Sequence, residues 1–118
     1  MIRTMILALV AGAGVLLGVS PVEAGRVSTP GSDRATVGAF SSITYDEDFF
    51  GGERANVIVV GDGSTMLRVT VYDENGNYIT SDTGYTASVT WYPRWTGEFT
   101  IRVVNLGAYH NTYSMRSN

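Results

Sequence analysis

The fold class is decided by one stretch of the chain, residues 66–77, which has the sequence MLRVTVYDENGN. Leu67, Val69 and Val71 occupy every second position of it. Because side chains alternate between the two faces of a β-strand, we expect these three residues to face the core. Asn75-Gly76 follows at once, and this dipeptide is the strongest short-range signal for a β-hairpin.

The same alternation recurs further along the chain. It puts Ala87, Val89 and Trp91 on one face of a strand, and Phe99, Ile101 and Val103 on one face of another. A continuous apolar run at 57–60 predicts a strand that is covered on both faces. In all, strands are predicted at 39–45, 54–60, 66–72, 78–80, 86–92, 98–105 and 108–115, with an acidic turn at 46–48 and a loop at 81–84.

No segment has a sustained helical period, and turn signals separate the strands at intervals of roughly 8–12 residues. Thr, Val, Tyr and Gly are plentiful, as is typical of β proteins. We therefore predict an all-β domain, a single antiparallel β-sandwich.

Residues 1–24 have the three parts of a cleavable signal peptide in the required order. Arg3 provides the positive start, an uncharged apolar run follows, and Val22-Glu23-Ala24 forms the cleavage site. The run is shorter than the roughly 20 residues that span a bilayer, although an uncleaved membrane anchor is the alternative. Residues 25–38, rich in Ser, Thr, Gly and Pro, are expected to be a flexible linker to a domain at 39–118.

The composition of the chain excludes several classes of partner and of chemistry. The chain has a net charge of −3 and no basic stripe, so we expect no nucleic-acid partner. The acidic balance also argues against binding to anionic membranes after signal cleavage. The absence of cysteine excludes disulfides, thiolate zinc sites and cysteine nucleophiles.

Several acidic residues lie in segments predicted to be loops. The favoured interpretation is that these carboxylates are solvated and cap turn amides, so that no cofactor is needed. Calcium is the alternative, because hard cations take several converging oxygen ligands. In that case Asp46, Asp48 and Asp73 are the first candidates.

The segment 91–95 concentrates aromatic side chains around Pro93. Trp91 shares its face with Val89 and is expected to be in the core. Tyr92, Arg94 and Trp95 are the candidate ligand-binding residues, since exposed aromatic faces stack on sugars or anchor peptides. For Trp95 the favoured interpretation is nevertheless that it packs across the end of the sandwich as a plug, because large aromatic residues are usually mostly buried.

Catalysis has little support. His110 is the only histidine, and no serine lies in a Gly-x-Ser-x-Gly context. A domain of this size also has little room for a cleft, so we expect no enzyme activity.

Three segments together resemble the bacterial pre-peptidase C-terminal domain family. They are Val71-Tyr72-Asp73-Glu74-Asn75-Gly76-Asn77, Thr96-Gly97-Glu98-Phe99-Thr100-Ile101-Arg102-Val103-Val104-Asn105, and Asn111-Thr112-Tyr113. The resemblance covers residues 45–118. It implies a secreted, jelly-roll-like β-sandwich that is usually appended to exported hydrolases as a non-catalytic module.

The relatives include the collagen-binding domains of clostridial collagenases, some of which bind calcium. This chain departs from the pattern in two respects. No catalytic domain accompanies the sandwich, and Ser64, Met66 and Arg68 stand where the family often has acidic residues. The second departure weakens a calcium site carried over from the relatives.

The function predicted from these observations is a binding or accessory module, periplasmic or secreted, that contacts a protein or a polysaccharide. A cell-envelope protein that assembles through its own sheet edges is the alternative. A small hydrolase is a third class. Ligand and oligomeric state are not encoded in any motif found.

Overall fold

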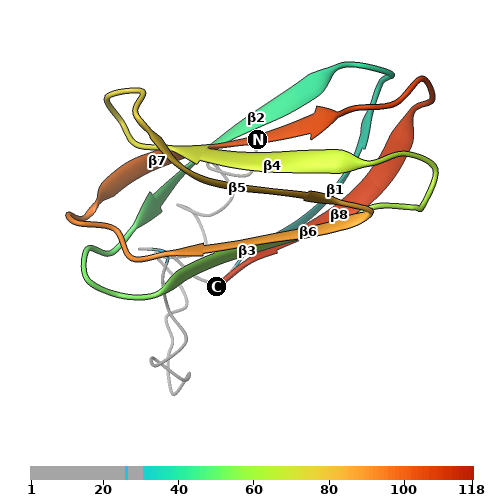
Figure 1. The fold of residues 1–118 in the computed structure, drawn as a ribbon. Coiled ribbons are helices and arrows are strands. Elements are labelled where there is room, and N and C mark those ends of the chain that lie inside the picture. The colour runs from blue at the N-terminus through green and yellow to red at the C-terminus, as the bar shows by residue number, and fades with distance from the viewer. Residues whose placement is uncertain (1–25, 27–30) are drawn as a thin grey trace.

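The structure is a computed structural model that describes Arg26 and residues 31–118. The described chain folds into two antiparallel sheets packed face to face (Figure 1). The strands are β1 (Gly31–Val37), β2 (Ser42–Phe49), β3 (Ala55–Val60), β4 (Leu67–Tyr72), β5 (Tyr78–Gly84), β6 (Thr86–Trp91), β7 (Gly97–Asn105) and β8 (Asn111–Ser117).

One sheet has the strand order β1-β8-β3-β6 and the other has the order β2-β7-β4-β5. Consecutive strands therefore mostly alternate between the sheets, and this order is that of a jelly roll. The prediction of an all-β antiparallel sandwich is confirmed. Among Arg26 and residues 31–118, no helix has the length and hydrophobicity needed to cross a membrane.

The inner faces form the core that the alternation predicts. Leu67, Val69 and Val71 of β4 are fully buried, and the predicted core faces of β6 and β7 are buried as well. Phe49, Trp91 and Phe99 pack edge to face or tilted, with ring centroids 4.9 to 6.1 Å apart. Such pairs add to the stability gained from burial alone.

The predicted linker at 25–38 is wrong in its second half, where β1 pairs with β8 from Gly31 to Val37. β1 is an edge strand, so only one of its sides is hydrogen-bonded, and its outward residues Ser32, Arg34 and Thr36 are polar. Short polar residues on an exposed edge look like a linker in sequence. The sandwich thus begins at β1, whereas the proposed signal segment lies outside the described residues.

The acidic turn predicted at 46–48 is wrong too, because these residues lie within β2 and pair with β7. Asp46 and Asp48 face outward, while Glu47 is buried between the sheets. The loop predicted at 81–84 belongs to β5, and the last strand starts at Asn111 rather than at residue 108.

The apolar run 57–60 is covered on one face only. Val57 and Val59 are fully buried, whereas Ile58 and Val60 are exposed on the outer face of β3. A β-sandwich has a single interior, so neither sheet needs apolar residues on both faces.

The β4–β5 hairpin is confirmed, and its turn has a specific form. Gly76 donates to the carbonyl of Asp73 at 3.0 Å, and Asp73 donates to the carbonyl of Asn77 at 2.9 Å. Gly76 has φ +84°, whereas Asn75 has no positive φ. The turn is therefore a type I turn closed by a glycine bulge, and Gly76 supplies the left-handed conformation that it requires.

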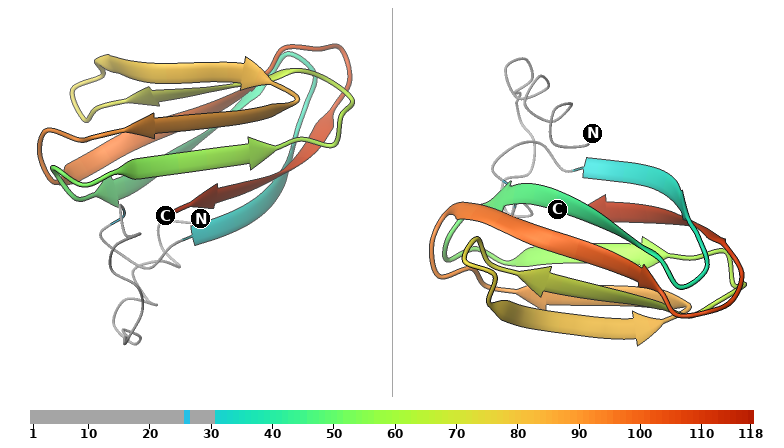
Figure 2. Two further views of the ribbon diagram at one scale, coloured as in Figure 1. Left: turned by 60° about the horizontal axis from the view of Figure 1, so that its bottom comes forward. Right: turned by 90° about the horizontal axis from the view of Figure 1, so that it is seen from above.

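The loops gather at the two ends of the sandwich (Figure 2). The cavity end comprises the loops 50–54, 73–77 and 92–96. The distal end comprises the loops 38–41, 61–66 and 106–110 together with Tyr85, where the chain passes from β5 to β6.

Candidate functional site

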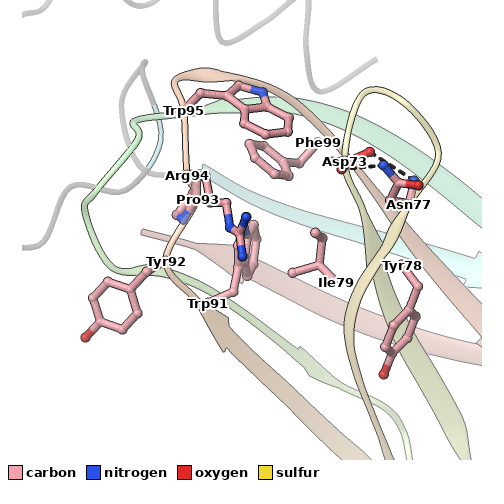
Figure 3. A pocket seen from close by; sticks show the side chains of 10 residues that line it. All are labelled: Asp73, Asn77, Tyr78, Ile79, Trp91, Tyr92, Pro93, Arg94, Trp95 and Phe99. Atoms are coloured by element: carbon pink, nitrogen blue, oxygen red, sulfur yellow. Dashed lines mark hydrogen bonds between the residues drawn. The ribbon is translucent and has the colours of Figure 1, made fainter.

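A cavity of about 460 Å³ opens at the cavity end (Figure 3). This volume lies within the range of small-molecule sites. Its walls come from β5, β6, β7 and the two loops beside them. The lining residues are Asp73, Asn77, Tyr78, Ile79, Trp91, Tyr92, Pro93, Arg94, Trp95 and Phe99.

The loop 92–96 is held in place by the neighbouring loop 50–54. Gly52 donates to the carbonyl of Pro93 at 2.7 Å, and Gly51 donates to the hydroxyl of Thr96 at 2.8 Å. A Cβ on Gly51 would lie 2.6 Å from the backbone of Trp95. Only glycine permits this close approach, so the position of Trp95 depends on Gly51.

The floor of the cavity is aromatic, and one of its residues has an unsatisfied buried donor. Trp91 and Phe99 belong to both the core and the cavity lining. The buried indole N–H of Trp91 has no hydrogen-bond partner among the described residues. Leaving such a donor buried and unpaired costs about 1–3 kcal/mol.

All three candidate ligand-binding residues line this one cavity. Trp95 is partly exposed, at 38%, whereas Tyr92 is 65% exposed and its ring points away from the other lining side chains (Figure 3). Arg94 forms no ion pair among the described residues. Most of the Trp95 surface is therefore buried, and Arg94 and Trp95 border an open recess.

Ile79, Phe99 and Trp91 were not predicted as site residues. Alternation assigns Trp91 and Phe99 to the core, where they lie, and Ile79 packs against it. Only their place at the end of a strand opens them to the cavity. A buried tryptophan at the last position of a strand, directly before a proline-containing loop, was the available signal.

Asp73 lies on the rim of the cavity, and its carboxylate stabilises the β4–β5 hairpin turn. It accepts hydrogen bonds from the backbone of Asn75 and Asn77 at 2.9 Å and from the Asn77 side chain at 3.1 Å. These donors, chiefly the Asn77 backbone, hold the pKa of Asp73 below its ordinary value. The carboxylate is thereby committed to the turn.

The other two metal candidates lie elsewhere on the sheet. Asp46 and Asp48 project from the outer face of β2, where Asp46 accepts a hydrogen bond from Thr100 at 2.9 Å. The described residues contain no group of three or more His, Cys, Asp or Glu side chains placed to hold a metal ion. The structure thus does not join Asp46, Asp48 and Asp73 into one ligand set.

Asp62, Ser64 and His110 meet at the distal end, but not as a nucleophile with its base. The Ser64 hydroxyl donates to Asp62 at 2.5 Å and lies 3.0 Å from the backbone carbonyl of His110. None of the hydrogen bonds among the described residues involves the His110 imidazole. A serine nucleophile needs a base to take its proton, and here a turn carboxylate occupies the hydroxyl.

Searches of known protein families and of curated proteins give no match. Solved structures do match in fold. The pre-peptidase C-terminal domain of a Bacillus anthracis collagenase superimposes with a TM-score of 0.67 at 14% sequence identity, over 86% of this chain and 100% of that domain.

Two further structures share the sandwich. The periplasmic inhibitor of g-type lysozyme from Aeromonas hydrophila has a TM-score of 0.59 at 14% identity, over 85% of this chain and 91% of the inhibitor. The Yersinia pseudotuberculosis-derived mitogen has a TM-score of 0.58 at 9% identity, over 76% and 85% of the two chains. The chain thus has a β-sandwich fold like that of a pre-peptidase C-terminal domain.

Proposed function

We propose that this protein is a non-catalytic binding module that takes a protein or polysaccharide ligand at the cavity end. The observation that carries the proposal is the convergence of Trp91, Arg94 and Trp95 on one open recess. An aromatic wall and a cationic side chain together suit a ligand that carries an apolar face and a hydrogen-bond acceptor.

The chemistry of the described residues favours binding over catalysis. Asp73, the carboxylate at the cavity, is committed to its hairpin, and no imidazole lines the recess. General acid–base catalysis needs a titratable group within reach of the ligand. The structural neighbours agree with a binding role, since one is a domain appended to a collagenase and another is a lysozyme inhibitor.

We further propose that the module works in the periplasm or outside the cell. Residues 1–24 have the pattern of a signal peptide, and one structural neighbour is described as periplasmic.

The test uses intrinsic fluorescence, because both tryptophans of the chain line the cavity. We would titrate the protein with soluble peptidoglycan fragments as the polysaccharide probe and with a g-type lysozyme as the protein probe. Binding at the cavity should shift the emission of Trp91 and Trp95 in a saturable manner. It should weaken about tenfold in Trp95→Ala and in Arg94→Ala, which remove an aromatic contact and a charged donor.

Arg102→Ala is the matched control, since Arg102 is exposed on the outer face of β7, away from the cavity. It should leave the titration unchanged. If the Trp95 and Arg94 variants bind the ligand as strongly as the wild type does, the cavity is not the binding site. A sedimentation profile of an oligomer, with no response to either probe, would favour the self-assembling alternative.

A further inference from the structure

The outer face of the sheet β1-β8-β3-β6 carries positive charge and no negative charge. Its charged outward side chains are those of Arg34 on β1 and Arg116 on β8, and both are exposed. Asp33 is the one acidic residue in these four strands, and it occupies an inward position of β1. Burial, and to a lesser degree the charge of Asp33, raises the pKa of Tyr45 in the core. The Asp33 carboxylate is therefore directed toward the opposite sheet and not toward the two arginines.

The two arginines are diagonal neighbours across the β1–β8 ladder. Arg34 lies opposite Ser114, and Arg116 lies opposite Ser32. Residues directly opposite each other have Cβ atoms about 4.5–5.5 Å apart, and diagonal neighbours about 7–8 Å, which long side chains can span. These four residues, all exposed, form one group on two neighbouring strands, which we call the Arg–Ser quartet.

A shallow recess of about 480 Å³ lies at the quartet. Its lining residues are Ser32, Asp33, Arg34, Ser114, Met115 and Arg116. Asp33 and Met115 occupy the inward positions between members of the quartet. The outward side chains at the recess are therefore two guanidinium groups and two hydroxyl groups.

The protein makes no use of these polar groups itself. Within Arg26 and residues 31–118, none of the four side chains has a hydrogen bond or an ion pair. The planar guanidinium group has five N–H donors in a fork that matches the oxygens of an anion, and each serine hydroxyl adds a further donor. The quartet thus brings positive charge and free donors together without an internal partner.

The opposite sheet also has a pair of arginines on its outer face, but their surroundings differ. Arg68 on β4 and Arg102 on β7 are diagonal neighbours too. Each of them donates to a hydroxyl group on the next strand at 3.4 Å. Their sheet also has acidic residues in outward positions, which are Asp46, Asp48 and Glu98. This second pair is therefore a natural control with the same charge and similar spacing.

The surroundings of the quartet suit a ligand that combines negative charge with hydroxyl groups. Most outward positions of the four strands have hydroxyl side chains, which are Ser32, Thr36, Thr86, Ser88, Thr90, Thr112 and Ser114. A hydroxyl group both donates and accepts hydrogen bonds, as the hydroxyl groups of a sugar do. Guanidinium groups bind carboxylate, sulfate or phosphate groups on the same chain of sugars.

Other anionic ligands fit this face less well. A single small anion would be held weakly, because exposed ion pairs contribute little in water. A polymer that repeats its charge gains affinity from several simultaneous contacts. Anionic bilayers attract clusters of about four to eight basic residues, and protein interfaces rely on aromatic anchors. The outward positions of the four strands provide two basic residues and no aromatic residue.

We propose that the outer face of β1 and β8 binds an anionic polysaccharide, whose acidic groups are held between Arg34 and Arg116 and accept hydrogen bonds from Ser32 and Ser114. No residue of the quartet lines the cavity at the other site. This second site therefore stands whether or not the cavity binds a ligand.

The test compares polymers that share one sugar backbone. Calorimetry measures the binding of dextran sulfate, carboxymethyl-dextran and neutral dextran to the purified protein. We expect at least one of the two anionic dextrans to bind and neutral dextran not to bind. The affinity should fall as the salt concentration rises, because salt screens charges at an exposed site.

Two double variants separate the site from the effect of net charge. Arg34→Gln/Arg116→Gln should weaken binding about tenfold or more, since arginine is often a dominant contact at a binding surface. Arg68→Gln/Arg102→Gln removes the same charge from the other sheet and should weaken it less than about twofold. The melting temperature of Arg34→Gln/Arg116→Gln should stay close to that of the wild type, because both side chains are exposed and unpaired. Trp95→Ala should leave binding of the anionic dextrans unchanged.

Three outcomes would overturn the proposal. The first is an equal loss of affinity in the two double variants, which would mean that net charge alone attracts the polymer. The second is a wild-type protein that binds neither anionic dextran at low salt. The third is tighter binding of poly-L-glutamate, or of vesicles of phosphatidylcholine and phosphatidylglycerol, that is lost in Arg34→Gln/Arg116→Gln. That result would assign the quartet to an acidic protein or to a membrane instead.

Discussion

Arg26 and Glu47 form an ion pair inside the sandwich, where their exposed fractions are 1% and 2%. The Arg26 guanidinium also donates to the Ser117 hydroxyl at 2.8 Å, and the Arg26 backbone donates to the carbonyl of Asn118 at 3.0 Å. Burial lowers the pKa of Arg26, although Glu47 opposes this shift. The pair thus joins a residue before β1 to β2 in one sheet and β8 in the other.

Arg26→Met should destabilise the protein by about 3–5 kcal/mol, because it removes the positive charge that the buried Glu47 carboxylate faces in this ion pair. The loss is measured as the change in unfolding free energy in urea. We expect the slope of the denaturant dependence to stay the same, since the core is retained.

The control for this prediction is the double variant Arg26→Met/Glu47→Leu, which removes both charges. Replacing a buried pair by apolar side chains is often neutral or stabilising, so the double variant should regain most of the loss. If it is as unstable as Arg26→Met alone, the lost stability does not come from the unpaired charge.

Asn105→Ala should lower the free energy of unfolding by about 3 kcal/mol or more, because it leaves several buried polar groups at the distal end without their hydrogen-bond partner. The isosteric Asn105→Asp keeps the shape but loses the donors to the carbonyls of Val37, Gly38 and Tyr109. It should be at least as damaging. Thermal unfolding measures both variants, and an Asn105→Asp protein of native stability would show that packing rather than hydrogen bonding holds the loops.

Core positions could be predicted from the sequence in strands that have one solvent-exposed face and one buried face. The alternation in β4, β6 and β7 is local, so the core positions could be found without tertiary information. β1 was missed because its outward residues are polar and it contributes little to the core. Glu47 was placed in a turn because its partner, Arg26, is distant in sequence and falls outside any strand pattern.

Only part of the candidate site could be predicted from the sequence. The aromatic residues at 92–95 could be found from composition. Trp91 and Ile79 could not, because they occupy inward-facing positions of their strands, as core residues do. Whether these two side chains line a cavity depends on where β5 and β6 end relative to each other. The distal end could not be predicted from the sequence, because it is assembled from four separate connections.

Val103→Asp tests the assignment of faces in β7. Val103 is fully buried and its neighbour Arg102 is exposed. A carboxylate in the core has no partner there, so Val103→Asp should abolish cooperative unfolding. Arg102→Asp should change the unfolding free energy by no more than about 0.5 kcal/mol. Similar effects of the two substitutions would contradict the inward and outward assignment.

Calcium should leave the thermal unfolding of this protein unchanged. Asp46 is bonded to Thr100, Asp73 is committed to its hairpin, and the described residues contain no group of three or more His, Cys, Asp or Glu side chains placed to hold a metal ion. A cation that bound only the native state would raise the melting temperature. A rise of several degrees in millimolar calcium, reversed by EDTA, would reveal a site that these contacts do not predict.

Asp62 should contribute to the loss of stability in acid. Hydrogen bonds from the Ser64 side chain, and then from the backbones of Thr112 and Ser64, lower the pKa of Asp62 from 3.8 to about 2. The ionised carboxylate therefore contributes stability that is fully present above the unfolded-state pKa, near 3.8. This contribution is lost as the pH falls through the folded-state pKa of about 2.

The melting temperature should accordingly fall between about pH 4 and pH 2. Asp62→Asn should lower it at neutral pH and flatten the decline in this window, because the variant has no carboxylate to protonate. Asp48→Asn removes an exposed carboxylate from β2 instead and should keep the steep decline. An identical pH profile for the wild type and Asp62→Asn would mean that other carboxylates, such as Asp73 with its lowered pKa, govern acid unfolding.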